Sequence, residues 1–514
     1  IKLYSFLQWR YVMVFTFTKS LCPECLSLIN AYIYEENNKI IIEKKCKDHG
    51  IFKDIYWGDA NLYKKFKNFA HDGDGLKNPI TLDENGCPRD CGICPRHKTT
   101  TILANIDLTN RCNQRCPICF ANAAVSGYLY EPTLEQIKNM LSILRNEQPV
   151  PCPAVQFSGG EPTMREDLVE IVKIAKVFGF PQIQLATNGI RLSRDLELCK
   201  KLFKAGLKTI YLQFDGVTKE PYEITRGYNA LPVKLKAIEN IRKSGIKSIA
   251  LVPTLIKGVN DHQVGDIIKF TSKNIDVIKG VNFQPVSFAG RIDRKERELR
   301  RITIPDLLKL IEEQTDQQIT REDLYPVPFV TPISHFISAN KKEIQVEFTV
   351  HPHCGAGTYV FVDKGKFIPI TRFIDVEGLM ETLNEMANEL TLKKIITNIE
   401  VPQAINKIMA TGKFLKKIPS FVDVKKAPSN INVANLLINV LISGTAEATA
   451  EFHRNTMFIG VMHFQDLYNF DIERITRCGI HYATPDGRLI PFCTYNSIYR
   501  GEVEKKFSKK LEEM

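Results

Sequence analysis

Between residues 99 and 290 the chain alternates six times between a short apolar segment and a longer amphipathic one, and this alternation limits the fold more than any other feature. The apolar segments are rich in Ile, Val, Leu or Phe: TILANIDLT (101–109), AVQFSGG (154–160), QIQLATNG (182–189), TIYLQFDG (209–216), SIALVPTLIKG (248–258) and VIKGVNFQPVS (277–287). Strands that alternate with helices form parallel sheets. We therefore predict an α/β fold built on a partial (β/α)6 barrel, with its site at the carboxyl ends of the strands.

The chain has 514 residues, which is too long for one ordinary core and suggests several domains. We expect a metal-binding module at 1–98, the barrel at 99–300 and a C-terminal α+β domain at 301–514 that binds substrate and an auxiliary cluster. Asn37-Asn38 marks a hairpin turn in the first part. In the second part, Thr133 and Gln136 form a capping-box pair that opens the clearest helix.

Three cysteines, Cys112, Cys116 and Cys119, follow the first predicted barrel strand at spacings that leave three and then two residues between them. Three thiolates can hold three irons of a 4Fe–4S cube and leave the fourth iron open to a small molecule. A zinc knuckle is the alternative, but no fourth ligand follows at knuckle spacing. The open corner favours a catalytic cluster.

With this loop, residues 99–300 resemble the radical S-adenosylmethionine (SAM) superfamily. SGGEP (158–162), ATNG (186–189), QFDG (213–216), VPTLIKGVND (252–261) and NFQPVS (282–287) each end a predicted strand, where that superfamily binds SAM. Ile118 stands where an aromatic residue is common and would cover the adenine. The resemblance implies that SAM is bound by Ile118, Phe120, Gly159, Gly160, Glu161, Pro162, Thr187, Asn188, Gln213, Asp215, Arg226, Thr254 and Gln284, and that the cluster cleaves SAM to a 5′-deoxyadenosyl radical.

The N-terminal cysteines predict a separate mononuclear site. Cys22 and Cys25, with Cys46 and His49, are similar to the paired knuckles of a zinc ribbon or a rubredoxin. We expect a tetrahedral zinc or iron ion there. His49 is either the fourth ligand or a structural histidine whose place a distant cysteine takes.

Six further cysteines suggest one or two auxiliary 4Fe–4S clusters. Cys87, Cys91 and Cys94 repeat the three-cysteine pattern just before the barrel, and Cys354, Cys478 and Cys493 are scattered through the last third of the chain. Extra ligands could come from His97, His351, His353 or His481. Ordinary buried thiols are the alternative for the scattered trio, and we expect Cys152 and Cys199 to be packing residues.

The formal net charge of +11 is not gathered into a long basic block, so we do not expect a nucleic-acid partner. An excess of this size could favour an anionic membrane surface. The opening residues are interrupted by charges and lack a cleavage site, and 431–444 is too short to span a bilayer. We expect a cytoplasmic protein without a transmembrane segment that contacts a membrane peripherally.

Taken whole, the chain resembles the archaeal tetraether synthases, which couple the terminal carbons of two phytanyl chains of glycerol ether lipids. CPEC…CKDHG, CPRDCGICPRH, NRCNQRCPICFA, FSGGEPTMRED and the three late cysteines carry this resemblance. It implies an archaeal diether or tetraether lipid substrate, trapping of an alkyl radical on an auxiliary cluster, and a low-potential electron donor such as ferredoxin. The alternatives are a radical SAM methyltransferase acting on a pterin, because some archaeal methylases carry a similar CPxDCGxCPxH element, and a plain electron-transfer protein.

Overall fold

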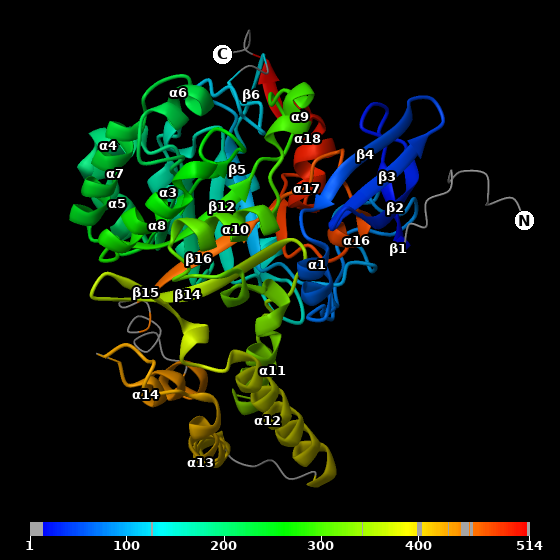
Figure 1. Cartoon of the computed structure of the whole chain (residues 1–514). Helices are drawn as coiled ribbons and strands as arrows, with labels where there is room; N and C mark the ends of the chain where they lie inside the picture. The colour runs from blue at the N-terminus through cyan, green and yellow to red at the C-terminus, as the bar shows by residue number, and fades with distance from the viewer. Residues whose placement is uncertain are drawn as a thin grey trace, which may run out of the picture.

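The computed structural model of the chain describes residues 14–124, 127–341, 343–397, 403–429, 431–443, 452 and 456–510. Its centre is a 13-stranded sheet (Figure 1). The six predicted strands lie side by side and parallel in chain order: β5 (Leu103–Thr109), β7 (Ala154–Gly159), β8 (Gln182–Thr187), β9 (Thr209–Gln213), β10 (Ile249–Val252) and β12 (Ile278–Pro285). This arrangement confirms the predicted α/β fold.

Amphipathic helices connect these strands and bury their apolar faces. They are α2 (Leu134–Arg145), α3 (Leu168–Val177), α4 (Ile190–Arg194), α5 (Leu196–Ala205), α6 (Glu220–Arg226), α7 (Leu231–Ser244) and α8 (Val264–Lys273). The predicted capping box is present, since Thr133 Oγ1 accepts from the backbone of Gln136 and the Gln136 side chain accepts from Thr133 N. Each crossover therefore returns the chain so that all six strands end at the same edge of the sheet.

Strands from the last third of the chain extend this sheet at both edges. β17 (Ile480–Ala483) runs parallel to β5, and β16 (Thr456–Met462) runs parallel to β12. Beyond these two strands lie β18 (Leu489–Pro491) beside β17, β14 (Gly355–Asp363) beside β16, and β13 (Tyr325–Pro326) and β15 (Lys366–Pro369) beside β14. The short β11 (Thr254–Leu255) pairs with β12. Residues on both sides of position 300 share one sheet, so the predicted division there stays a prediction.

A separate four-stranded antiparallel sheet precedes the barrel and is drawn in blue in Figure 1. It consists of β1 (Val14–Leu21), β2 (Leu28–Glu36), β3 (Lys39–Cys46) and β4 (Gly50–Trp57), followed by α1 (Ala60–Lys67). Asn37 and Asn38 have φ angles of 51° and 57°, as the predicted hairpin turn requires. The sheet is fastened to the C-terminal part by Thr18 Oγ1 and Tyr56 Oη, which donate to the two carboxylate oxygens of Asp471 at 2.6 and 2.7 Å.

A lobe of helices lies below the sheet in Figure 1 and has its own apolar core. The lobe contains α11 (Thr331–Lys341), α12 (Val376–Thr397), α13 (Gln403–Phe421) and α14 (Val433–Leu437). The remaining elements are β6 (Tyr128–Tyr130), α9 (Arg297–Arg300), α10 (Ile304–Gln314), α16 (Ile472–Ile475), α17 (Phe492–Thr494), α18 (Arg500–Lys506) and β19 (Ser508–Lys510). None of the helices in the described ranges has the length and apolar character needed to cross a membrane.

Candidate metal centres and cofactor site

The three-cysteine loop leaves the carboxyl end of β5, as predicted. Asn110 holds the start of the loop, because its side-chain oxygen accepts from Tyr130 N at 3.0 Å and its amide nitrogen donates to Tyr128 O at 2.9 Å. Burial raises the pKa of Cys112 to about 12, and the nearby Cys116 and Cys119 thiols act in the same direction. The loop thus places its cysteines where burial disfavours the charged thiolate form.

Two glycines at the end of β7 let the second motif pack directly on this loop. A side chain on Gly159 would lie 2.3 Å from the carbonyl oxygen of Thr109, and one on Gly160 would lie 2.2 Å from that of Arg111. In the space so left, Gly160 N donates to Thr109 O at 2.7 Å, and the next residue, Glu161, donates its N–H to Arg111 O at 2.8 Å. The glycines are needed because backbone meets backbone here.

The carboxylate of Glu161 joins the ends of β7 and β8. It is 1% exposed and accepts from Thr163 Oγ1 at 2.6 Å, from Thr187 Oγ1 at 2.8 Å and from the backbone of Asn188 at 2.8 Å. Pro162 follows it in a short 3-10 turn. The side chain of Asn188 reaches the cysteine loop itself, where it donates to Asn113 Oδ1 at 2.7 Å. SGGEP and ATNG therefore form one hydrogen-bonded wall beside the three thiols.

A buried ion pair lies just beyond the end of β9 and beside the start of β11. Arg226 donates to both carboxylate oxygens of Asp215, at 2.7 and 2.8 Å, and also to Thr254 Oγ1 at 3.3 Å. Burial by itself would raise the pKa of Asp215, but the Arg226 charge lowers it below its ordinary value. The Asp215 and Cys116 groups in turn raise the pKa of Arg226 against the effect of burial. The pair thus aims a guanidinium at the cysteine loop.

Lys234 on α7 is a site residue that the sequence analysis did not single out. Its ammonium is fully buried and donates to the Asn188 carbonyl oxygen at 2.5 Å and to Gln213 Oε1 at 3.0 Å. Burial lowers its pKa to about 7. The sequence does contain a signal for this residue. Lys234 falls among the apolar residues of LPVKLKAIENI that form the buried face of the helix, and a lysine on a helix is usually exposed.

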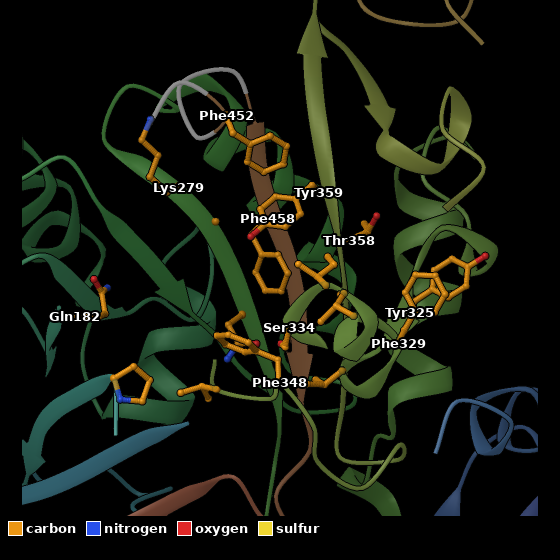
Figure 2. Close-up of a pocket in the computed structure, with 18 of the residues that line it drawn as sticks. Gln182, Lys279, Tyr325, Phe329, Ser334, Phe348, Thr358, Tyr359, Phe452 and Phe458 are labelled. Atoms are coloured by element: carbon orange, nitrogen blue, oxygen red, sulfur yellow. The ribbon is translucent and has the colours of Figure 1, made fainter. Parts of the chain in front are cut away.

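Gln284 connects the strand-end site to a large cavity. Its side chain and that of Asn282 both donate to the hydroxyl of Tyr211, the former at 3.4 Å. Tyr211 and Asn282 line a cavity of about 2070 Å³ that opens between the sheet and the helical lobe (Figure 2). Phe329, Phe348, Tyr359, Phe452 and Phe458 make much of its wall aromatic. The cavity is larger than the pockets that hold most small ligands.

The two residues predicted to cover the adenine lie on the cysteine loop but differ in their surroundings. Ile118 is partly buried and packs against the apolar group of Ile256, Val259, Val286 and Phe288. Phe120 is 39% exposed and tilts against Phe492, with ring centroids 6.0 Å apart. Gly290 allows the chain after β12 to touch this loop, because any side chain there would meet Cys119 O at 2.3 Å.

The N-terminal knuckles converge into a four-ligand group. Cys22, Cys25, Cys46 and His49 offer ligand atoms that all lie within 4.8 Å of one another. Cys25 and Cys46 sulfurs are 3.8 Å apart, and His49 Nδ1 lies 3.7 Å from Cys22 and 3.5 Å from Cys46. A tetrahedral ion with bonds of about 2.3 Å to sulfur and about 2.05 Å to nitrogen requires edges of about 3.8 and 3.6 Å. The geometry favours His49 over a distant cysteine as the fourth ligand.

The six remaining cluster candidates adjoin one another across the β17–β18 hairpin. Burial raises the pKa of Cys91 far above its ordinary value, and the thiols of Cys87, Cys478 and Cys94 add to the effect. Burial likewise raises the pKa of Cys493, and the thiols that add to it are Cys478 and Cys354. The charge of Cys478 thus acts on Cys91 of one trio and on Cys493 of the other. Cys152 and Cys199 are fully buried outside this group, as expected for packing residues.

The histidines proposed as extra ligands take up different positions. His353 stacks on Tyr63 with ring centroids 3.9 Å apart, and its neighbour His351 accepts from His353 N at 3.3 Å. His97 lies beside Cys478, whose carbonyl oxygen is 2.7 Å from His97 Nε2, and it meets His481 at 3.1 Å. The His97–His481 pair thus lies next to the backbone of Cys478, whereas the His353 ring is engaged in packing.

Comparison with known proteins decides the family. The model of the Radical SAM superfamily matches residues 106–271, and that of the HMPTM N-terminal zinc ribbon domain matches residues 14–58. A protein of Methanocaldococcus jannaschii, the 7,8-dihydro-6-hydroxymethylpterin dimethyltransferase, is 54% identical over 499 residues, which are 96% of this chain and 96% of that protein. This chain belongs to the same family, within the radical SAM superfamily.

More distant similarities involve smaller parts of this radical SAM protein. A GTP 3',8-cyclase of Clostridium acetobutylicum is 26% identical over 233 residues, which are 45% of this chain and 67% of that protein. The crystal structure of Streptococcus suis SuiB bound to S-adenosylmethionine covers 44% of this chain and 46% of its own, with 17% identity and a TM-score of 0.34.

The expected resemblance to tetraether synthases is wrong at the level of the substrate. The relative that matches almost the whole chain is named for dimethylation of a pterin, and the zinc ribbon model carries the related name HMPTM. Coupling of lipid chains has no support in these findings. The pterin alternative considered from the sequence is the better supported one.

The cofactors of the superfamily fit the residues that are present. SAM and a 4Fe–4S cluster need three converging thiols beside an open polar wall, and the strand ends supply both. The donor set of three sulfurs and one imidazole nitrogen suits a mononuclear zinc or iron ion in the ribbon.

Proposed function

We propose that this radical SAM enzyme transfers methyl groups to a pterin, with 7,8-dihydro-6-hydroxymethylpterin as the acceptor. The observation that carries the proposal is the 54% identity to the dimethyltransferase along 96% of both chains. An electron-transfer role is less suitable, because an electron carrier has no use for the polar wall formed by Gly159–Pro162 and Asn188.

Each residue of the strand-end site has a role in this proposal. Cys112, Cys116 and Cys119 hold the cluster, and the wall of Gly160, Glu161 and Asn188 orients the amino-acid part of SAM. When bound, the cluster and SAM supply a 5′-deoxyadenosyl radical that abstracts hydrogen. Ile118 and Phe120 cover the adenosyl part and keep water from it. The remaining SAM-binding candidates are Thr187, Gln213, Asp215, Arg226, Thr254 and Gln284.

The acceptor would lie where the cavity meets the strand ends. Tyr211 and Asn282 line the cavity, and Gln284 shares the Tyr211 hydroxyl with Asn282. Amide and hydroxyl groups of this kind are the partners that a pterin ring can hydrogen-bond. The cavity wall includes the amino ends of β8, β10 and β12, so the acceptor would have to reach the proposed SAM site past Tyr211 and Asn282, as transfer of a hydrogen atom requires.

The other cysteines would bring electrons to this site. We assign Cys87, Cys91 and Cys94, and Cys354, Cys478 and Cys493, to one or two auxiliary 4Fe–4S clusters. Cys478 influences the pKa of a thiol in each trio, which supports placing the two trios near one another, and a low-potential protein such as a ferredoxin would be the external donor. The ribbon ion, held by four protein ligands without an open position, would have a structural role.

The test is an anaerobic reaction of the reconstituted enzyme with SAM, a low-potential reductant and 7,8-dihydro-6-hydroxymethylpterin. We expect 5′-deoxyadenosine together with pterin that has gained first one and then two methyl groups by mass. SAM is the only methyl source in this mixture, so SAM is the proposed methyl donor, and SAM labelled in its methyl group should pass the label to the pterin. Release of 5′-deoxyadenosine with an unchanged pterin would contradict the proposal, and Cys112→Ser serves as the inactive control.

The position of the acceptor is tested separately with Tyr211→Phe. Loss of the hydroxyl that binds Asn282 and Gln284 should raise the KM for the pterin, while SAM cleavage without the pterin continues. Ser272→Ala is a matched control, because Ser272 loses one exposed hydroxyl on α8 that bonds only to Lys269 O at 2.8 Å. An unchanged KM in Tyr211→Phe would place the acceptor elsewhere.

A further inference from the structure

We propose a second mononuclear metal site, formed by His71, His335 and Glu347, that binds a divalent transition-metal ion such as Zn²⁺. The three side chains offer ligand atoms that lie within 4.8 Å of one another. Among the described residues, only the zinc ribbon forms another group of this compactness. The proposal does not depend on the proposed function.

Two imidazoles approach the same carboxylate oxygen. His335 Nε2 lies 2.8 Å from Glu347 Oε1, and His71 Nε2 lies 3.9 Å from the same oxygen. An ion with bonds of about 2.0–2.2 Å to nitrogen and oxygen requires its ligand atoms to be about 3–3.5 Å apart. The two observed distances lie on either side of this range, so a small rotation of the His71 ring would complete the set.

The three ligands come from segments that are held in place independently of any ion. His71 follows α1, His335 lies on α11 and Glu347 lies between α11 and β14. Thr349 fastens two of these segments, since its hydroxyl donates to His71 O at 2.6 Å and its N–H donates to Glu347 O at 2.9 Å. Ser338 Oγ accepts from Gln345 N at 2.9 Å and fixes the third.

Gly73 leaves room for the carboxylate of Glu347. A side chain on Gly73 would lie 2.7 Å from Glu347 Oε2 and 3.0 Å from Lys98 O. The neighbouring acid Asp72 is already paired, with Lys98 at 2.8 Å and with Arg477.

The donor set and its exposure define what would bind. Two imidazoles and one carboxylate suit zinc, iron, cobalt or nickel in the divalent state, and leave further positions for water. The side chains are 38%, 34% and 23% exposed for His71, His335 and Glu347, so an ion can enter from solvent. None of the three ligands contains sulfur, so spectroscopy can distinguish an ion bound here from one bound by the cysteines of the ribbon.

The experiment counts metal on the full chain with its ribbon intact. The wild type, His335→Gln and Glu347→Gln are dialysed against Zn²⁺ in a weak chelator, and bound zinc is measured by mass spectrometry. We expect both variants to hold one zinc per chain less than the wild type. His262→Gln, which changes an exposed histidine elsewhere, is the matched control and should keep the wild-type count. Equal zinc in all four proteins would overturn the proposal.

A second measurement identifies the ligands by their spectrum. Co²⁺ is added to Cys46→Ser, in which the ribbon has lost a ligand, and to the same protein with His335→Gln. We expect the difference between the two spectra to show weak visible bands of cobalt bound to nitrogen and oxygen, without thiolate charge-transfer absorption. X-ray absorption of the wild type with two zinc ions should likewise show one ion without sulfur ligands, and zinc coordinated only as in the ribbon would also overturn the proposal.

Discussion

The zinc ribbon and the loop after β5 use cysteine in opposite ways. In the ribbon, four ligand atoms are already at tetrahedral separations and leave no position open. In the loop, Cys112, Cys116 and Cys119 do not belong to any of the described groups whose ligand atoms lie within 4.8 Å of one another, so their spacing does not suit a single ion. The difference shows how one chemistry serves two purposes: a closed ligand set holds structure, whereas an incomplete set leaves room for a reactant.

The two sites also differ in the sequence separation of the residues that form them. The ribbon lies within residues 22–49, and its first knuckle is closed by Cys22 N donating to Ser27 O at 2.9 Å. The strand-end site joins Thr109 to Gly160, Asp215 to Arg226 and Cys119 to Gly290. Substitutions of ribbon residues should therefore disturb mainly the ribbon, whereas substitutions of barrel residues should lower the catalytic activity.

The largest effect is expected from Cys116→Ser. Loss of one of three cluster ligands should abolish release of 5′-deoxyadenosine, while the ribbon metal remains at its wild-type level. Metal analysis and an anaerobic cleavage assay check both points. Cys199→Ser, which changes a buried packing cysteine, should cleave SAM normally, and equal loss in both variants would contradict the distinction.

The reverse experiment is Cys46→Ser. We expect loss of the ribbon ion and increased hydrogen exchange across β1–β4, because structural zinc contributes several kcal/mol or more to the folding of small domains. Contacts of Thr18 and Tyr56 with Asp471 should limit the damage to this sheet. If SAM cleavage disappeared as completely as in Cys116→Ser, the two sites would not be separable.

Asp215→Asn tests whether burial determines how much an ion pair contributes to the stability of the fold. Removing one partner of a buried pair costs about 3–5 kcal/mol, so we expect a clear fall in stability and a weaker affinity for SAM. The control is Asp276→Asn on the surface, where the bond from Arg242 is 2.6 Å and the side chains are 38% and 57% exposed. An exposed pair contributes about 0–1 kcal/mol, and similar losses in both variants would argue against this account.

Lys234→Met tests whether the buried ammonium makes the free energy of unfolding depend on pH. The folded-state pKa of about 7 lies below the ordinary lysine value, so folding releases a proton between the two values and stability rises as pH increases. The wild type should gain up to about 1.4 kcal/mol per pH unit above pH 7 relative to Lys234→Met. Denaturant unfolding at pH 7.5 and 8.5 measures the difference, and parallel curves would mean that Lys234 titrates normally.

The smallest effect is expected from His49→Cys. A fourth sulfur preserves a tetrahedral set, so the protein should keep one ribbon ion and change in stability by less than about 1 kcal/mol. Spectra of the Co²⁺-substituted protein would show an added thiolate. His49→Ala should lose the ion more readily, and equal retention in both variants would show that His49 is not a ligand.

The sequence alone determined the elements whose information is local. The six βα units, the capping box at Thr133 and the Asn37-Asn38 turn follow from periodicity and from the preferences of single residues, so they were predicted correctly. The cysteine spacing identified the superfamily for the same reason. The substrate class was predicted wrongly, because several of the motifs used are shared among enzymes that differ in what they bind.

Only the tertiary structure decided which distant groups meet. Three findings depend on segments that lie far apart in sequence: the buried contacts of Lys234, the effect of Cys478 on thiols of both trios, and the group of His71, His335 and Glu347. β16 and β17 likewise complete the edges of a sheet that begins more than three hundred residues earlier. Such contacts depend on how the faces of the elements pack, and a sequence pattern records which face is apolar but not which partner it finds.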